Sequence, residues 1–154
     1  MEINDLISTQ SVVANLHATS KKQAIQDLAK KAADITGLHE RAIFEVLMER
    51  ERLGTTGVGN GIAIPHGKLA NLDKLYGLFA RLEKPIDFQS IDEQPVDLIF
   101  LLLAPETAGA DHLKALARVS RLLRDKTVCD KLRGTDQSEA LYALLIEETA
   151  HQAA

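Results

Sequence analysis

A histidine between a proline and a glycine is the most conspicuous chemical feature of this sequence. His66 follows the short apolar run 62–64 and lies between Pro65 and Gly67. An unperturbed imidazole has a pKa of about 6.5, so at neutral pH it is mostly uncharged and can act as a nucleophile or base. Proline ends the run on extended backbone, and glycine lets a bulky anion approach. The pattern predicts a short strand that ends at a nucleophilic His66; the alternative is a half-buried histidine with both ring nitrogens hydrogen-bonded.

The glycine-rich segment GTTGVGNG (54–61) precedes this histidine. Its backbone N–H groups and its two threonine hydroxyls suit an oxyanion such as phosphate. The segment lacks the Lys-Ser/Thr ending of a P-loop, so nucleotide binding is not indicated, and glycine-rich turns are also common without a ligand. We predict a phosphate-binding loop made of Thr55, Thr56, Gly57, Asn60 and Gly67.

A second histidine could assist the same anion. His112 follows Asp111, which can cap a helix, so the ring is predicted in the first helical turn. A helix N-terminus attracts anions and disfavours the imidazolium form, so His112 could donate a hydrogen bond without adding a full charge. The alternative is a surface residue that only flanks the cap.

One arginine is expected to face the core near this loop. Arg50 shares a predicted core-facing helical stripe with the apolar residues Ile43, Val46, Leu47 and Leu53, whereas Arg52 falls on the outer side. An inward guanidinium at the end of a helix could bind a phosphate, or it could pair with a carboxylate. Lys68 could reach the same anion, although a solvated lysine is the simpler interpretation.

Other kinds of site find little support. The five histidines have no HxH or HExxH spacing, and the single Cys129, in an apolar-polar pattern, is expected to be a buried structural thiol. A zinc site could only be assembled across space, for example from His66, His112 and Asp111. Paired-carboxylate, Ser/His/Asp and dinucleotide motifs are not found. We therefore expect no metal and no cofactor.

The elements that must position these residues follow an α/β pattern. Apolar runs predict strands, and 3.6-residue periodicity with capping signals predicts helices. We expect residues 1–154 to form one single-domain α/β sandwich, with a mixed central β-sheet flanked by helices on both faces. The expected strands are 11–18, 62–66, 75–83 and 96–104; the expected helices are 19–37, 39–53, one starting at Asp111, 125–134 and one starting at Asp136.

Composition narrows the class of partner. The chain has 154 residues, 45% hydrophobic and 26% charged, with a formal net charge of −4 and 4% aromatic residues. The chain has no excess of positive charge and few aromatic residues on which bases could stack, so nucleic acid is not indicated as a partner. The N-terminus shows no signal-peptide pattern, and the longest apolar run is too short to span a bilayer. A cytoplasmic protein without membrane insertion is expected.

Three segments, taken together, resemble a known family. They are RERLGTTGVGNGIAIPHGK (50–68), PIDFQSIDEQPVDLIFLLLAP (85–105) and DHLKAL (111–116). Over nearly the whole chain, they are similar to the type-2 (fructose/mannitol) enzyme IIA family of the bacterial phosphoenolpyruvate-dependent phosphotransferase system. The nitrogen-regulatory branch of that family, whose members are free-standing single domains, resembles the chain most.

The resemblance implies a phosphorelay and regulatory role. His66 would accept a phosphoryl group from the histidine of an HPr-like phosphocarrier, His112 would assist, and Arg50 would stabilise the phosphate. Downstream regulatory proteins would then read the phosphorylation state. The alternatives are a sugar-specific enzyme IIA that passes phosphate to a separate IIB transporter component, a metal-dependent hydrolase, and a phosphate-binding module without turnover. Candidate apolar residues for a docking rim around His66 are Val58, Ile62 and Ile64.

Overall fold

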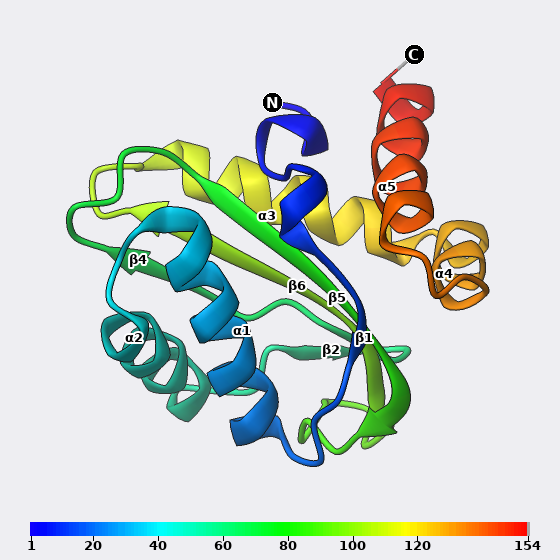
Figure 1. The fold of residues 1–154 in the computed structure, drawn as a ribbon, viewed down its shortest axis with the longest axis horizontal. Helices are drawn as coiled ribbons and strands as arrows, with labels where there is room; N and C mark the ends of the chain where they lie inside the picture. The colour runs from blue at the N-terminus through cyan, green and yellow to red at the C-terminus, as the bar shows by residue number, and fades with distance from the viewer. Residues whose placement is uncertain (154) are drawn as a thin grey trace.

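A mixed β-sheet forms the centre of the protein (Figure 1). The computed structural model describes the backbone of residues 1–153 and the side chains of residues 1–147; the end of the predicted domain, Ala154, lies outside the described residues. Six strands pair in the order β1-β5-β6-β3-β2, and β4 also pairs with β6. The strands are β1 (Val12–Leu16), β2 (Gly57–Gly59), β3 (Ile62–Ala63), β4 (His66–Leu69), β5 (Tyr76–Ile86) and β6 (Val96–Pro105).

Strand β6 lies at the middle of the sheet because it is apolar on both faces. Its residues 98–104 are at most 1% exposed, as expected for a strand covered on two sides. It pairs antiparallel with β5 on one side and parallel with β3 and β4 on the other. Ile99, Leu101 and Leu103 pack into one core cluster, whereas Leu98, Phe100 and Leu102 pack into the other.

Helices cover both faces of this sheet (Figure 1). Helices α1 and α2 pack on one face, and the short 3₁₀ helix η1 with α3, α4 and α5 packs on the other. The predicted α/β sandwich with a mixed sheet and helices on both faces is therefore confirmed. The bounds are η1 (Ile3–Asp5), η2 (Thr9–Ser11), α1 (Lys21–Thr36), α2 (Glu40–Arg52), α3 (Ala110–Arg124), α4 (Lys126–Arg133) and α5 (Ser138–Ala153).

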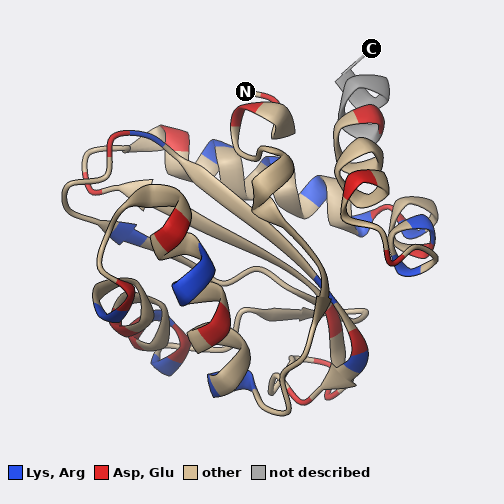
Figure 2. Ribbon diagram, viewed as in Figure 1, with Lys and Arg blue, Asp and Glu red and all other residues tan. Residues whose placement is uncertain are grey.

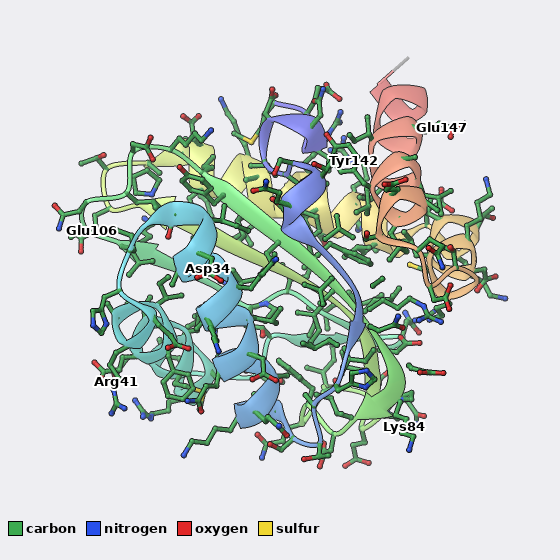
Figure 3. The ribbon with its side chains drawn as sticks, in the orientation of Figure 1. Asp34, Arg41, Lys84, Glu106, Tyr142 and Glu147 are labelled. Atoms are coloured by element: carbon green, nitrogen blue, oxygen red, sulfur yellow. The ribbon has the colours of Figure 1, made fainter. Side chains whose placement is uncertain are left out.

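Charges are distributed over the outside of these layers. Figure 2 shows lysine and arginine interspersed with aspartate and glutamate on helices and loops, while residues 98–104 of β6 carry no charge. Labelled charged side chains such as Asp34, Arg41 and Lys84 are exposed and project outward (Figure 3). No helix among the residues described is long and apolar enough to span a membrane.

Two predicted helix starts are wrong. The N-cap of α3 is Gly109, which makes no side-chain cap bond, so Asp111 lies in the first turn instead of capping the helix. Helix α5 begins at Ser138, two residues after Asp136, whose carboxylate accepts a hydrogen bond from the side chain of Gln137. Acidic residues are also favoured within the first turn, so their presence fixes a helix start only to within a few residues.

Candidate functional site

Proline splits the predicted strand that was expected to end at His66. Residues 62–63 form β3, Pro65 follows, and His66 is the first residue of β4, so the predicted strand end is wrong. Both short strands pair along the same side of β6, and the amide of Leu102 donates to the carbonyl of Pro65 at 2.9 Å. Proline lacks a backbone N–H but keeps its carbonyl as an acceptor, so β3 and β4 keep the same register with β6 on both sides of Pro65. His66 therefore begins a strand.

The two ring nitrogens of His66 have different partners. Nδ1 lies 2.9 Å from the carbonyl oxygen of Ile64, and Nε2 accepts from Nε of Arg50 at 3.3 Å. Because a guanidinium can only donate, Nε2 must carry a lone pair, and the proton of the neutral ring is on Nδ1. Burial lowers the pKa of His66 below 6.5. The hydrogen bond to Ile64 partly offsets this shift, and the positive charge of Arg50 lowers the pKa further. The ring is therefore neutral at pH 7, with its nucleophilic nitrogen away from the backbone.

Arg50 faces inward, as predicted. It is half-buried near the C-terminal end of α2, and its Nη1 donates to the carbonyl of Gly54 at 2.9 Å while Nε donates to His66. Arg52 is exposed and lies 3.4 Å from Glu49. Two nitrogens of the Arg50 guanidinium are thus held by hydrogen bonds. This places its positive charge beside Nε2 of His66, where a phosphoryl group bound to Nε2 would carry negative charge.

His112 lies in the first turn of α3, as predicted, and its ring is next to that of His66. It is buried at 7% exposure in the first turn of α3, and the two ring centroids are 5.6 Å apart. Burial lowers the pKa of His112, and the neighbouring His66 and Lys68 lower it further. Its Nδ1 is buried and has no hydrogen-bond partner among residues whose side chains are described. An unpaired N–H costs more than an unpaired acceptor, so the neutral ring is expected to carry its proton on Nε2.

Two cavities meet at His66. The larger, of about 390 Å³, is also lined by His112, Gly67 and Lys68, and the smaller, of about 200 Å³, by Thr55 and Thr56. Arg50 and His66 line both cavities. His66 therefore borders two hollows at the surface, each large enough for a phosphoryl group.

The predicted phosphate loop is only partly at this site. The hydroxyl of Thr55 donates to the carbonyl of Phe88 at 2.9 Å, and the hydroxyl of Thr56 bonds to Glu51, so neither is free for a ligand. Asn60 lines neither cavity; its backbone amide donates to the carboxylate of Asp92 at 2.9 Å. The structure does not bring Asn60 to His66.

The two predicted loop glycines are explained by packing. A Cβ on Gly67 would lie 2.4 Å from Cγ1 of Val46 on α2, and one on Gly57 would lie 2.3 Å from Oγ of Ser90. Real Cβ atoms do not approach so closely, so any side chain at these positions would push the neighbouring element away. These glycines allow α2 and the loop 87–95 to come close to the strands beside the site.

The apolar rim differs from the predicted one. Val58 is 48% exposed, but Ile62 and Ile64 are buried in the core. Helical spacing predicts that Leu53 and Leu113 face the core, and this prediction is wrong: they are 83% and 67% exposed. Leu53 directly follows α2, and Leu113 directly follows His112 in the first turn of α3. At the ends of a helix the apolar period does not fix which side chains the core covers.

No cluster of three or more potential metal-ligating side chains occurs in the described part of the chain. The predicted structural role of Cys129 agrees with its position: the thiol is buried and donates to the carbonyl of Leu123 at 3.2 Å. Burial raises the pKa of this thiol. Cys129 therefore packs in the core on the α3–α5 face, apart from the histidine pair.

Comparison with known proteins now decides the family. The sequence model described as "Phosphoenolpyruvate-dependent sugar phosphotransferase system, EIIA 2" matches residues 5–148. The chain belongs to this family. The type-2 EIIA protein is 61% identical over 145 residues to a nitrogen regulatory protein of Bradyrhizobium diazoefficiens, covering 94% of this chain and 95% of the relative. It is 40% identical over 148 residues to one of Klebsiella oxytoca, covering 96% and 91%.

Solved structures agree with this EIIA assignment. The crystal structure of nitrogen regulatory protein IIA-Ntr from Neisseria meningitidis superposes with a TM-score of 0.88 at 33% identity, covering 93% of this chain and 98% of that one. The family expected from the segments 50–68, 85–105 and 111–116 is thereby confirmed for this EIIA chain.

Proposed function

We propose that this EIIA protein, acting as one domain over residues 1–154, is a phosphorelay and regulatory protein of the nitrogen branch of the phosphotransferase system. Nε2 of His66 accepts the phosphoryl group from an HPr-like phosphocarrier. The observation that carries the proposal is the division of the ring: Nδ1 is tied to Ile64, and Nε2 keeps its lone pair beside Arg50. The names of the relatives support the regulatory role.

The chemistry is a direct transfer between two imidazoles. Nε2 of His66 forms the new N–P bond as the N–P bond to the donor histidine breaks, and the donor ring leaves with its electron pair. Such a transfer passes through a loose transition state, so it mainly requires positioning and charge stabilisation. The proton on Nδ1 stays on the hydrogen bond to Ile64 throughout, which keeps the ring from rotating.

Arg50 and His112 stabilise the transferred group. When the phosphoryl group arrives, the hydrogen bond from Nε of Arg50 to Nε2 of His66 breaks, and Nε donates to a phosphoryl oxygen instead. The hydrogen bond from Nη1 to the carbonyl of Gly54 keeps the guanidinium in place. His112, 5.6 Å away ring to ring, donates from Nε2. No step requires a metal ion or another cofactor.

The exposed apolar residues around the histidine fit successive protein partners. Leu53, Val58 and Leu113 are exposed close to the site in sequence, and aliphatic patches of this kind support transient docking. The phosphocarrier and the downstream regulatory proteins would use this surface in turn, in the cytoplasm. Bonding of the phosphate to His66 changes the charge at the centre of the surface, which lets a partner distinguish the two states.

Incubation with phosphoenolpyruvate, enzyme I and an HPr-like phosphocarrier tests the proposal. We expect one acid-labile, base-stable phosphate per chain, absent in His66→Ala and retained in the control His17→Ala, which changes an exposed histidine. Phosphate retained by a folded His66→Ala would refute the acceptor. Transfer onward to a sugar-specific IIB component would instead support the sugar-uptake alternative.

A further inference from the structure

Glu51 is an almost fully buried carboxylate directly after Arg50. Its side chain is 3% exposed and lies 2.6 Å from Nζ of Lys21, which is itself 13% exposed. The backbone amide of Thr56 donates to it at 3.1 Å, and the hydroxyl of Thr56 donates to its other oxygen. A buried ion pair is costly to desolvate and contributes little net stability, so its value lies in the geometry that it fixes.

One hydrogen-bonded path leads from Glu51 to Nε2 of His66. The backbone carbonyl of Glu51 accepts from the amide of Gly54 at 3.1 Å. The carbonyl of Gly54 accepts from Nη1 of Arg50 at 2.9 Å, and Nε of Arg50 donates to Nε2 of His66. The turn at Gly54 therefore sets where the guanidinium points.

A second path leads from Glu51 to the other ring nitrogen. The carboxylate binds Thr56, and the carbonyl of Thr56 accepts from the amide of Ile64 at 3.0 Å. The carbonyl of Ile64 in turn binds Nδ1 of His66 at 2.9 Å. Both nitrogens of the imidazole are thus connected to residue 51: Nε2 through its backbone carbonyl and Gly54, and Nδ1 through its carboxylate and Thr56. The carboxylate acts on the first path by fixing the segment 54–56, in which Gly54 lies.

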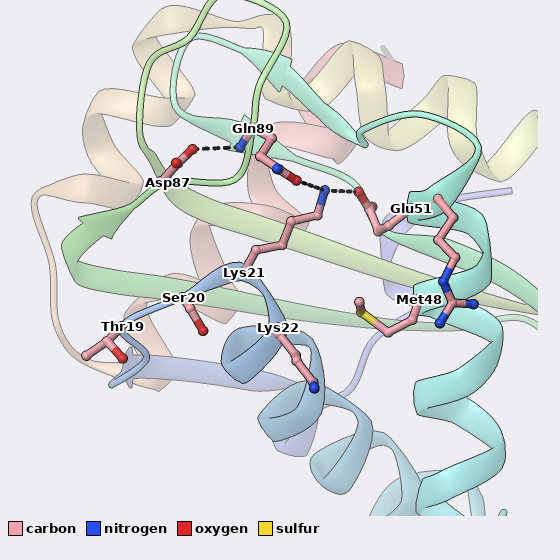
Figure 4. Close-up of a pocket in the computed structure, with 9 residues that line it drawn as sticks. Thr19, Ser20, Lys21, Lys22, Met48, Glu51, Asp87 and Gln89 are labelled. Atoms are coloured by element: carbon pink, nitrogen blue, oxygen red, sulfur yellow. Dashed lines mark hydrogen bonds and ion pairs between the residues drawn. The ribbon is translucent and has the colours of Figure 1, made fainter.

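Lys21, on the neighbouring helix α1, holds the carboxylate of Glu51 in place. Figure 4 shows the ammonium between Glu51 and Gln89, whose Oε1 lies 3.5 Å from Nζ, at the wall of a cavity of about 550 Å³. The same ammonium lies 5.0 Å from the centroid of the Phe88 ring. These contacts tie the first turn of α1 to the last turn of α2 and to residues 88–89, so the glutamate is fixed between two helices and a loop.

We propose that Glu51, ionised and paired with Lys21, is a positioning residue that sets the tautomer of His66 and the direction of Arg50 for phosphoryl transfer. Its three partners are all donors, so only a group that accepts at both oxygens satisfies them. A glutamine would turn an NH₂ group toward Thr56 or Lys21 and loosen the segment 54–56. The role in transfer rests on the function proposed above; the role in fixing the ring does not.

The test compares Glu51→Gln with Glu45→Gln, which removes an exposed carboxylate from the same helix. Nitrogen-15 NMR of the imidazole reports the tautomer of unphosphorylated His66, and single-turnover transfer from the phosphocarrier separates rate from apparent affinity. For Glu51→Gln we expect a mixture of Nδ1–H and Nε2–H forms and a transfer rate reduced roughly 10-fold, with unchanged affinity for the carrier. Glu45→Gln should match wild type in both.

Lys21 and Thr56 provide independent variants. Lys21→Met should shift both readouts in the same direction, and Lys21→Arg should restore them, because arginine keeps the charge and the donor. If Glu51→Gln does not fold, Thr56→Val decides, since it removes one donor and leaves the ion pair; we expect a smaller shift of the same sign.

The proposal is overturned if a folded Glu51→Gln, or Thr56→Val in its place, keeps the wild-type tautomer and the wild-type rate, even with a lowered melting temperature. The tautomer measurement needs no phosphate. If wild type accepts none, the function fails while the NMR result still decides what Glu51 does.

Discussion

The two ends of the glycine-rich segment both consist of glycine and small polar residues, but they are attached to different parts of the fold. The near end (54–57) is tied to α2: Gly54 bonds to Arg50, and Thr56 bonds to Glu51. The far end (59–61) is tied to the opposite edge of the protein, where Nη2 of Arg133 donates to the carbonyl of Asn60 at 2.8 Å. The near end borders the histidine site, and the far end closes the β2–β3 hairpin.

This difference shows what small polar residues do beside an active histidine. The hydroxyls of Thr55 and Thr56 and the backbone amide of Asn60 donate to partners within the fold, so these three donors are not available to an anion. The candidate phosphate donors are the side chains of Arg50 and His112, which come from helices on opposite faces of the sheet. The near end positions the site, and the far end stabilises the sheet.

The largest expected difference is between two arginines. Arg50→Ala removes the charge beside Nε2 and should lower the phosphoryl-transfer rate about 100-fold, the effect of losing one donor to a transition-state anion. Arg133→Ala should leave the transfer rate within about 2-fold. It should reduce the free energy of unfolding by roughly 1–3 kcal/mol, because the partly buried carboxylate of Asp97 loses its hydrogen-bonded partner.

Arg52→Ala is the matched control for Arg50, since it removes an exposed arginine two residues away. Equal losses of rate in Arg50→Ala and Arg52→Ala would contradict the inward role of Arg50. A large loss in Arg133→Ala, measured on folded protein, would mean that the far end also serves the site.

A smaller difference is expected in the pH dependence. Burial lowers the pKa of His66 and Arg50 lowers it further, so wild-type transfer should be constant from pH 7 to 8 and fall only below about 6.5. Removing the positive charge in Arg50→Ala should raise the pKa of His66 and move this fall to higher pH; Arg133→Ala should not. NMR titration of His66 in both variants measures the shift, and an unchanged pKa in Arg50→Ala would contradict it.

The same depressed pKa has a consequence for stability. The unfolded chain binds a proton at His66 near pH 6.5, whereas the folded protein binds it only at lower pH. The contribution of the neutral ring is therefore complete above about pH 6.5 and is lost as the pH falls through the lowered folded pKa.

The smallest effect is expected at Asn60. Its φ is +57°, a left-handed conformation that asparagine and glycine tolerate better than alanine. Asn60→Ala should reduce stability by about 1 kcal/mol, or about 2–4 °C in melting temperature, and Asn60→Gly should have little effect. Both should keep wild-type phosphoryl transfer. If folded Asn60→Gly transferred phosphate more slowly than wild type, Asn60 would after all contribute to phosphate binding.

The fold and the three central residues were accessible from the sequence for definite reasons. The apolar run of β6 and the periodic helices carry strong local signals, and Arg50 could be oriented because the apolar period of α2 fixes which side faces the core. The predicted end of the helix 19–37 was also correct to within one residue, because the glycine at 37 takes the left-handed conformation that ends a helix. Such features depend on neighbours within about four residues.

What the sequence could not predict depends on distant partners. The split at Pro65 is tolerated because β3 and β4 both find β6 more than 30 positions later. The hydroxyl of Thr55 is occupied by Phe88, and the carboxylate of Glu51 by Lys21. Composition indicated a loop rich in donors, but only tertiary contacts determine whether a donor is already satisfied.

The pairing of β4 with β6 also bears on when the site can form. Among the described strands, β6 is the only partner of β4, and the parallel register joins His66 to Leu102. His112 follows later still, on α3. During synthesis from the N-terminus, Arg50 and His66 therefore leave the ribosome well before the strand that fixes them. A nascent chain that stops before residue 96 has its histidine but no strand to orient it, so we expect the proposed phosphoryl acceptance only after β6 and α3 have been synthesised.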